Sequence, residues 1–367
     1  MYIGSDIIEE IVCQISDHVG DGMALLSIAE HTPVSVHSLI EALNTQNIRF
    51  MGAIFPKVIH DSSIYDKGIV LNTLNNVVTG TSYIVKEIHK KEFPIPRIVL
   101  KENTSYCVMT FVDGLTSHIS HYLSELYKQF GSNTSYFGGG AGSLSLSQAP
   151  CVFNEEGIFQ DAAVLAILET RASIGVKHGW KKIKGPVIAT RTERNIIKQI
   201  NWNTAFPVYR EIVEQDSDHT FNDDNFFSIA KAYPFGILKE AAEYVVRDPI
   251  ATNEKGELIC VGEVPENTVL DILKGEEKSL IAAAKMAAEE SLSSAGNPEK
   301  AYIIDCISRV LFLEDSFEDE LGEVVSTIRK NNTDISVGGA LTLGEISSYG
   351  EGYLDFFNKT IVVGLFE

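Results

Sequence analysis

One pattern occurs three times along this chain of 367 residues and restricts its fold more than any other feature. In each copy, an apolar run of strand length is followed by a loop, an amphipathic helix and a second short strand that ends at glycine. The copies span residues 23–52, 106–138 and 302–339. Apolar strands that alternate with helices are typical of an α/β protein. The similarity of the second and third copies predicts two related halves.

Helical periodicity locates the helix of each copy. Apolar residues recur on one face, as in the stretch around Leu123 and Leu126, and Ser35 is placed to cap the first helix. The pattern therefore predicts helices at residues 35–43, 117–130 and 317–328.

Between the copies the pattern changes to hairpins. A turn composition at residues 154–157 separates two apolar runs, and alternating or β-branched runs follow. We expect mixed, largely antiparallel sheets with helices packed outside, in an αββα-like layering. The predicted elements are strands at residues 151–153, 158–169, 173–179, 185–190, 195–202, 257–261, 268–273, 302–309, 340–347 and 359–366, and a helix at 277–292.

The pattern also suggests where the chain divides. Near Asn203 a strand gives way to a helix at residues 208–214. We therefore expect an N-terminal helix within residues 1–21, a first domain at residues 22–203 and a second at residues 204–367.

Charge and composition exclude several classes of partner. Thirty Lys and Arg residues stand against fifty Asp and Glu, a formal net charge of −20 at pH 7. No basic run interleaves with aromatic residues, so nucleic acid and anionic membranes are not expected partners. The N-terminus lacks the features of a signal peptide, and polar residues interrupt the apolar runs, which predicts a cytoplasmic protein. The five cysteines are widely spaced and indicate neither disulfides nor zinc.

A glycine-rich segment is the first candidate for a ligand site. Four glycines in five positions follow Phe137, and glycine admits positive φ and close approach of a ligand to backbone N–H groups. The alternative is a tight connection between strands, in which glycine only satisfies the backbone. The segment does not match nucleotide-binding motifs. The candidate residues are Gly138, Gly139, Gly140, Ala141 and Gly142.

His178 and Trp180 form a second candidate, at the end of a predicted strand. The histidine is interpreted as a polar anchor in a pocket or as a residue held by structural hydrogen bonds. Arg247 and Arg309 each follow an apolar strand. Each could hold a ligand carboxylate with its guanidinium fork or form a structural salt bridge, Arg247 with Asp248 for example.

Cys306 and Glu345 complete the set of candidate ligand-binding residues. Cys306 alternates with apolar neighbours and is expected to be a buried thiol. Glu345 could bind a ligand amine, and together with an arginine it would match the two charged ends of an amino acid. An enzyme with Cys306 or Ser143 as nucleophile is a further alternative, although neither lies in a known catalytic motif.

Several of these segments together resemble the FIST domain family. The similarity covers nearly the whole chain, and the motifs occur in the same order as in the family. Where the family usually continues the glycine segment with an aspartate, this chain has Ser143, which argues against a carboxylate contact there. The matching segments are residues 111–114, 137–142, 176–180, 244–249, 306–309, 343–346 and 357–360.

The resemblance implies a bacterial sensory module for small molecules such as amino acids, without enzymatic activity. Some members of the family are described as haem-binding nitric oxide sensors that act on a histidine kinase, and in that version His178 would be the axial haem ligand. No F-box, kinase, cyclase or receiver sequence remains in the chain after the two FIST modules are assigned. Signal transduction would then require a partner protein.

Overall fold

The first copy of the repeated pattern forms a sheet around a parallel pair of strands. β2 (Met23–Ala29) and β3 (Phe50–Phe55) are parallel, and α2 (Val36–Thr45) connects them. The Ser35 hydroxyl caps α2 by accepting a hydrogen bond from the Ser38 N–H, as the sequence predicts. β6 (Ile69–Leu74) and β1 (Tyr2–Ile3) extend the sheet beyond β2, and α1 (Ile8–Val19) lies against it.

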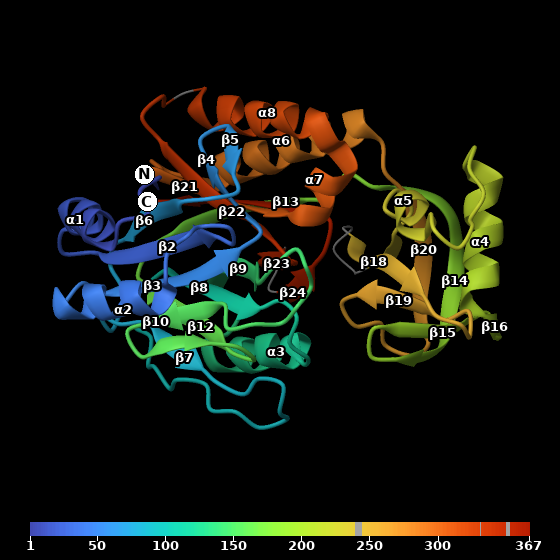
Figure 1. Cartoon of the computed structure of the whole chain (residues 1–367), viewed down its shortest axis with the longest axis horizontal. Helices are drawn as coiled ribbons and strands as arrows, with labels where there is room; N and C mark the ends of the chain where they lie inside the picture. The colour runs from blue at the N-terminus through green and yellow to red at the C-terminus, as the bar shows by residue number, and fades with distance from the viewer. Residues whose placement is uncertain (239–243, 331, 350–352) are drawn as a thin grey trace.

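The other two copies repeat this order of strands (Figure 1). In the second, β8 (Tyr106–Asp113) and β9 (Thr134–Ala141) are parallel and connected by α3 (Ile119–Phe130), with β12 (Ala163–Leu168) and β7 (Tyr83–Val85) beyond β8. In the third, β21 (Lys300–Cys306) and β22 (Ser336–Thr342) are parallel, with β25 (Ile361–Phe366) and β13 (Ala172–Lys177) beyond β21. Their connection consists of α7 (Ile307–Leu313), the 3₁₀ turn η1 (Glu314–Ser316) and α8 (Phe317–Arg329).

Each copy also contributes a hairpin to the sheet of another copy. The exchange is cyclic, so every six-stranded sheet contains strands of two copies and the copies interlock. The relationship expected between the second and third copies therefore extends to the first. The hairpins are β4 (Lys57–His60) with β5 (Ser63–Tyr65) on β22, β10 (Val152–Asn154) with β11 (Gly157–Phe159) on β3, and β23 (Glu345–Tyr349) with β24 (Tyr353–Phe357) on β9.

One glycine occupies the same place in each parallel pair. Gly52, Gly138 and Gly339 lie opposite Leu26, Thr110 and Ile303 in the register of their sheets. A Cβ at any of the three would collide with the carbonyl oxygen of that partner. Close strand approach therefore explains why each second strand carries a glycine.

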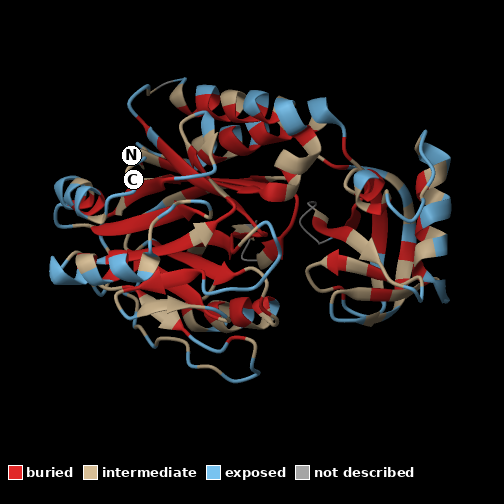
Figure 2. Ribbon diagram, in the orientation of Figure 1, coloured by how far each residue is buried: buried red, intermediate tan, exposed pale blue. Residues whose placement is uncertain are grey.

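The three sheets surround a common apolar core. Phe55, Phe111, Phe137 and Tyr302 meet there, with Phe55 and Phe111 at 5.2 Å and Phe137 and Tyr302 at 5.9 Å between ring centroids. Helices lie outside the sheets, among them α6 (Glu277–Ser294), and their outward faces are exposed (Figure 2). This arrangement confirms the expected α/β fold with outer helices.

Residues 181–274 form a second, smaller body in the right half of Figure 1. Its antiparallel strands close into a barrel, because β14 pairs with both β15 and β20. The strands before and after Asn203 share this sheet. Its elements are β14 (Lys181–Glu193), β15 (Ile196–Ile200), β16 (Asn203–Thr204), α4 (Ala205–Asp216), α5 (Phe226–Ala230), β17 (Phe235–Leu238), β18 (Tyr244–Thr252), β19 (Leu258–Val261) and β20 (Thr268–Lys274).

The structure is a computed structural model that describes residues 1–238, 244–330, 332–349 and 353–367. Three expected strands have different limits in it. The strand expected to begin at Tyr302 ends at Cys306, where α7 begins. The strand expected at 158–169 is divided into β11 and β12, and Gly344, with φ of +119°, separates β22 from β23. The sequence stays apolar through these bends, so composition does not indicate where each strand ends.

Candidate functional site

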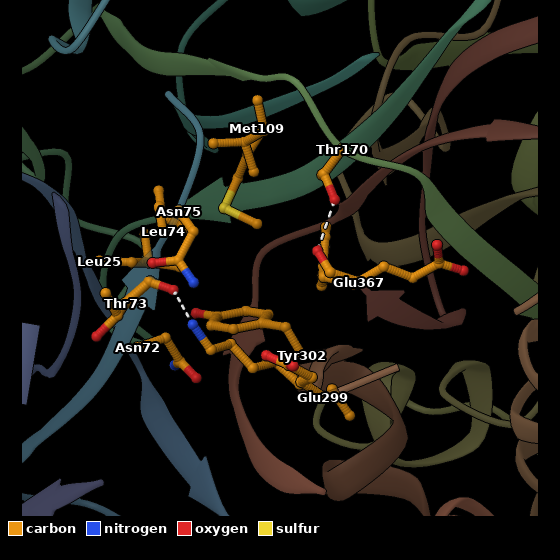
Figure 3. Close-up of a pocket in the computed structure, with 14 residues that line it drawn as sticks. Leu25, Asn72, Thr73, Leu74, Asn75, Met109, Thr170, Glu299, Tyr302 and Glu367 are labelled. Atoms are coloured by element: carbon orange, nitrogen blue, oxygen red, sulfur yellow. Dashed lines mark hydrogen bonds between the residues drawn. The ribbon is translucent and has the colours of Figure 1, made fainter. Parts of the chain in front are cut away.

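Hollows of about 430 Å³ beside Phe93 and about 380 Å³ beside Pro186 are open to the surface and lined by few residues. Two other cavities are more enclosed and differ in size. The smaller, of about 40 Å³, lies among Leu25, Met109 and Tyr302, and the Thr170 hydroxyl donates to the Glu367 carbonyl at 2.8 Å beside it (Figure 3). That volume accommodates little more than water. The larger cavity measures about 700 Å³, within the range of about 300–1,000 Å³ that is common for ligand pockets.

The larger cavity lies where parallel strands of the three six-stranded sheets end, and the barrel forms its other wall. We call the part of the molecule that contains these three sheets the main body. Gly114 follows β8, Cys306 ends β21 and Leu343 follows β22, while Arg247 and Ala251 belong to β18 of the barrel. Ligands of α/β proteins commonly bind outside the carboxyl ends of strands and between domains. We refer to this space as the barrel cavity.

Most of the barrel cavity wall is apolar, and a few polar side chains lie among the apolar ones. Such a wall suits a ligand with an apolar body and one or two polar groups. The apolar wall residues include Leu115, Leu144, Leu146, Phe227, Ile250, Val261, Leu311, Leu343 and Phe356; the polar side chains include His118, Arg194, Arg247, Glu263, Ser308 and Asn358.

Arg247 is a buried cation on this wall, with 5% of its surface exposed. Its Nε donates to the Glu263 carbonyl at 2.8 Å, and its Nη1 donates to the carbonyls of Val246 at 2.9 Å and Phe356 at 3.2 Å. Its Nη2 makes no hydrogen bond, and no carboxylate forms an ion pair with it, within the described part of the chain. Asp248 is the partner that the sequence analysis considered for Arg247. Its Oδ2 instead lies 3.1 Å from Lys359 Nζ. Burial lowers the pKa of the Arg247 guanidinium.

Asn358 and Gly262 complete the surroundings of this guanidinium. Asn358 is buried on the wall, and its Oδ1 accepts a hydrogen bond from Arg247 Nη1 at 3.4 Å. Its Nδ2 is buried and has no hydrogen-bond partner among the residues that the structure describes. Gly262 has φ of +81°, and a Cβ there would lie 3.0 Å from Arg247 Nε and from Asn358 Oδ1. Glycine is therefore needed for both the backbone angle and the contact.

Two matches with known domains cover most of the chain. Residues 22–203 match the FIST N domain and residues 205–348 match the FIST C domain. The chain belongs to the FIST family. FIST domains are sensory domains that bind small ligands in signal transduction. A search of curated proteins found no match. None of the helices in the described residues is long and apolar enough to cross a membrane.

The glycine-rich FIST segment is part of a strand in this protein. Gly138, Gly139, Gly140 and Ala141 belong to β9, and only the following Gly142 has positive φ, +137°. The Gly140 N–H donates to the Gly344 carbonyl at 2.7 Å, and the Gly142 N–H donates to the Ile54 carbonyl at 2.9 Å. These two N–H groups are used within the fold, the segment lies within a strand instead of forming a tight connection between strands, and none of the five residues lines the barrel cavity.

Arg309 in the FIST C domain is fully buried and saturated with partners. Glu320 accepts from its Nε at 2.9 Å and from its Nη2 at 2.5 Å, and Asp305 lies 3.3 Å from Nε. Its Nη1 and Nη2 also donate to the carbonyls of His178 and Leu280. Arg309 does not line the barrel cavity, so its geometry supports the salt-bridge alternative.

His178 and Trp180 lie next to Arg309 and away from the barrel cavity wall. The His178 Nδ1 accepts a hydrogen bond from the Trp180 N–H at 2.9 Å, and its ring packs against Tyr244 at 5.9 Å between centroids. The Trp180 indole N–H donates to the Lys359 carbonyl at 3.1 Å. Haem ligation by His178 stays a prediction. Within the described ranges, no cluster of three or more His, Cys, Asp or Glu residues could hold a metal ion.

Cys306 lies on the barrel cavity wall, whereas Glu345 lies behind it. Burial, with the Glu345 charge nearby, raises the pKa of the Cys306 thiol well above its usual value, which keeps the thiol protonated and weakly nucleophilic. Glu345 is fully buried and accepts hydrogen bonds from the Thr342 hydroxyl at 3.0 Å and the Thr360 N–H at 3.2 Å. Burial raises its pKa to about 8. Glu345 therefore does not face a ligand amine in the barrel cavity.

Of the sequence candidates, only Arg247 and Cys306 lie on this wall. Sequence reasoning missed the residues that surround Arg247, because Gly262 follows the paired strand β19 and Asn358 follows β24, 111 residues further along the chain. The segment 357–360 was a signal for Asn358, since it was one of the FIST motifs. Nothing local to Gly262 distinguishes it from other turn glycines.

Proposed function

We propose that this protein is a cytoplasmic sensor that binds a small ligand in the barrel cavity and passes the bound state to a partner protein. The observation that carries the proposal is a space of about 700 Å³, mostly apolar, at the carboxyl ends of β8, β21 and β22. Membership of the FIST family supports a sensory role for such a site.

The position of the barrel cavity suits a sensor, because its wall belongs to two bodies. The chain enters the barrel between β13 and β14 and leaves it between β20 and α6. Two connections therefore join the barrel to the rest of the protein. A ligand that contacts both bodies favours the arrangement in which both contacts are made. A partner that recognises this arrangement would respond to the ligand.

Thermal unfolding with a panel of amino acids, small carboxylates and neutral analogues tests this proposal. A ligand that binds only the folded state at 100 times its Kd adds about 2.7 kcal/mol to the free energy of unfolding. Ala251→Phe should abolish the stabilisation by filling the barrel cavity. Val269→Phe is the matched control, because Val269 is an exposed barrel residue outside the cavity wall. Stabilisation by no compound, or equal stabilisation of the Ala251→Phe variant, would contradict the proposal.

A further inference from the structure

We infer that the barrel cavity takes a monoanionic ligand, a carboxylate with an apolar body, whose carboxylate is held by Arg247 and Asn358. This inference rests on the proposed function and adds the chemical class of the ligand. Burial of these two side chains does not by itself indicate that they bind a ligand. The argument rests on the unused Nη2 donor of Arg247 at the cavity wall and on the unpartnered Asn358 amide beside it.

The first step is the charge of Arg247, with which no carboxylate of residues 1–238, 244–330, 332–349 or 353–367 forms an ion pair. A buried guanidinium is costly unless a carboxylate pairs with it, and its neighbours here are backbone carbonyls and one amide oxygen. These acceptors fix the direction of the fork through Nε and Nη1. Nη2 remains available for an anion that enters the cavity, and an arginine fork matches the geometry of a carboxylate.

The second step is the amide of Asn358. Its Oδ1 accepts from Arg247 Nη1, so the amide is oriented and its Nδ2 is the atom left without a partner. A buried donor with no acceptor costs about 1–3 kcal/mol. A carboxylate oxygen that accepts from Arg247 Nη2 would lie beside this buried amide, and a rotation of the Asn358 side chain toward the cavity would let Nδ2 donate to the second oxygen. Binding would then satisfy two unused donors at once.

The third step concerns the number of charges on the ligand. Glu263 lies on the same wall, and the charges of Asp355 and Glu263 act on Arg247 without forming an ion pair with it. A second wall arginine, Arg194, is exposed. One buried cation with acidic neighbours favours a single negative charge over a doubly charged phosphate. The apolar residues of the wall, Leu115 and Phe356 among them, would cover the rest of the ligand.

Matched pairs of acid and amide test this inference. Octanoate and phenylacetate keep nearly the shape of octanamide and phenylacetamide but carry a charge. We expect each acid to bind the wild-type protein at least 10-fold more tightly than its amide in calorimetric titrations. Arg247→Gln should remove this preference. Arg191→Gln is the control, because Arg191 is an exposed barrel residue outside the wall.

Asn358→Ser supplies a second variant that keeps Arg247 and removes the Nδ2 donor. It should reduce the acid preference about 3-fold to 10-fold, and circular dichroism of both variants would establish that they fold. Equal binding of acids and amides would overturn the inference and leave the proposed function standing. Binding of another panel compound, with no binding of octanoate or phenylacetate, would likewise overturn the inference and leave the proposed function standing. If no compound of the panel binds, both the inference and the proposed function fail.

Discussion

Two buried arginines of this protein differ in what surrounds the guanidinium. Arg309 faces Glu320 and Asp305, and backbone carbonyls accept its remaining N–H groups. Arg247 has carbonyl and amide acceptors, no ion pair within the described residues, and a cavity beside it. The comparison shows that burial of an arginine does not by itself indicate a binding site. What indicates one is a charge that the fold leaves uncompensated beside an accessible space.

The elements around the two arginines explain this difference. Arg309 joins β21, α6, α8 and the connection between β13 and β14, because each of these contributes a partner atom. Its pairs hold the outer helices to the sheet. Arg247 lies on the barrel side of the boundary, where Phe356 and Asn358 of the main body approach it. Its contacts therefore depend on how the two bodies meet.

The largest effect is expected for Arg309→Met. Removal of the cation leaves Glu320 and Asp305 buried without it, and breaking a buried pair in this way costs about 3–5 kcal/mol. Urea unfolding would measure the loss. Arg329→Met is the control, because Arg329 pairs with Asp61 at a partly exposed position and such pairs contribute about 0–1 kcal/mol. Similar losses for the two variants would contradict the structural role of Arg309.

A pH-dependent effect is expected for Glu345, which is near the Arg309 cluster. Its pKa rises from an ordinary 4.5 to about 8 in the folded state, so between these values the folded protein binds the proton that the unfolded chain releases. Stability should therefore fall as pH rises through this window and level off above it, with a slope of at most about 1.4 kcal/mol per pH unit.

Glu345→Gln should flatten this part of the stability profile, measured by urea unfolding from pH 5 to pH 9. The exposed Glu156→Gln variant is the control, and it should keep the wild-type slope. A Glu345→Gln profile parallel to that of the wild type would show that this carboxyl does not carry the pH dependence.

A smaller loss is expected for Arg247→Met without ligand. The variant leaves carbonyls and one amide without a donor but strands no paired carboxylate, so about 1–2 kcal/mol of stability should be lost. The same urea experiment measures it beside Arg309→Met. A loss as large as that of Arg309→Met would remove the distinction between the two arginines.

The smallest effect is the difference between two glycine substitutions. Gly131 and Gly262 both have positive φ, +75° and +81°, but a Cβ at Gly131 would meet nothing within 4 Å. Gly131 has ψ of −174°, a backbone region that almost only glycine adopts, so each alanine variant should lose about 1–3 kcal/mol from backbone strain. Gly262→Ala alone also presses its Cβ on Arg247 and Asn358. It should also weaken octanoate binding, which Gly131→Ala should leave unchanged.

Local features that depend on periodicity could be predicted from the sequence. The helices expected at 117–130 and 317–328 correspond to α3 and α8, and the strand–helix–strand order of all three copies is present. The strand expected to continue past Cys306 was wrong, because the apolar run enters α7 without a change in composition. Of the candidate site residues, Arg247 lines the barrel cavity and Arg309 does not. Both were expected to follow apolar strands, but Arg247 lies within β18 and Arg309 lies in α7.

The sequence by itself determined the α/β class, the three copies and the FIST family, because hydrophobic periodicity and short motifs are local properties of the chain. Only the tertiary structure decided the cyclic exchange of hairpins, the closure of the barrel and the partners of each buried charge. These depend on pairings between residues far apart in the chain, as when Asn358 meets Arg247. A local pattern cannot specify which distant acceptor or carboxylate will face a given guanidinium.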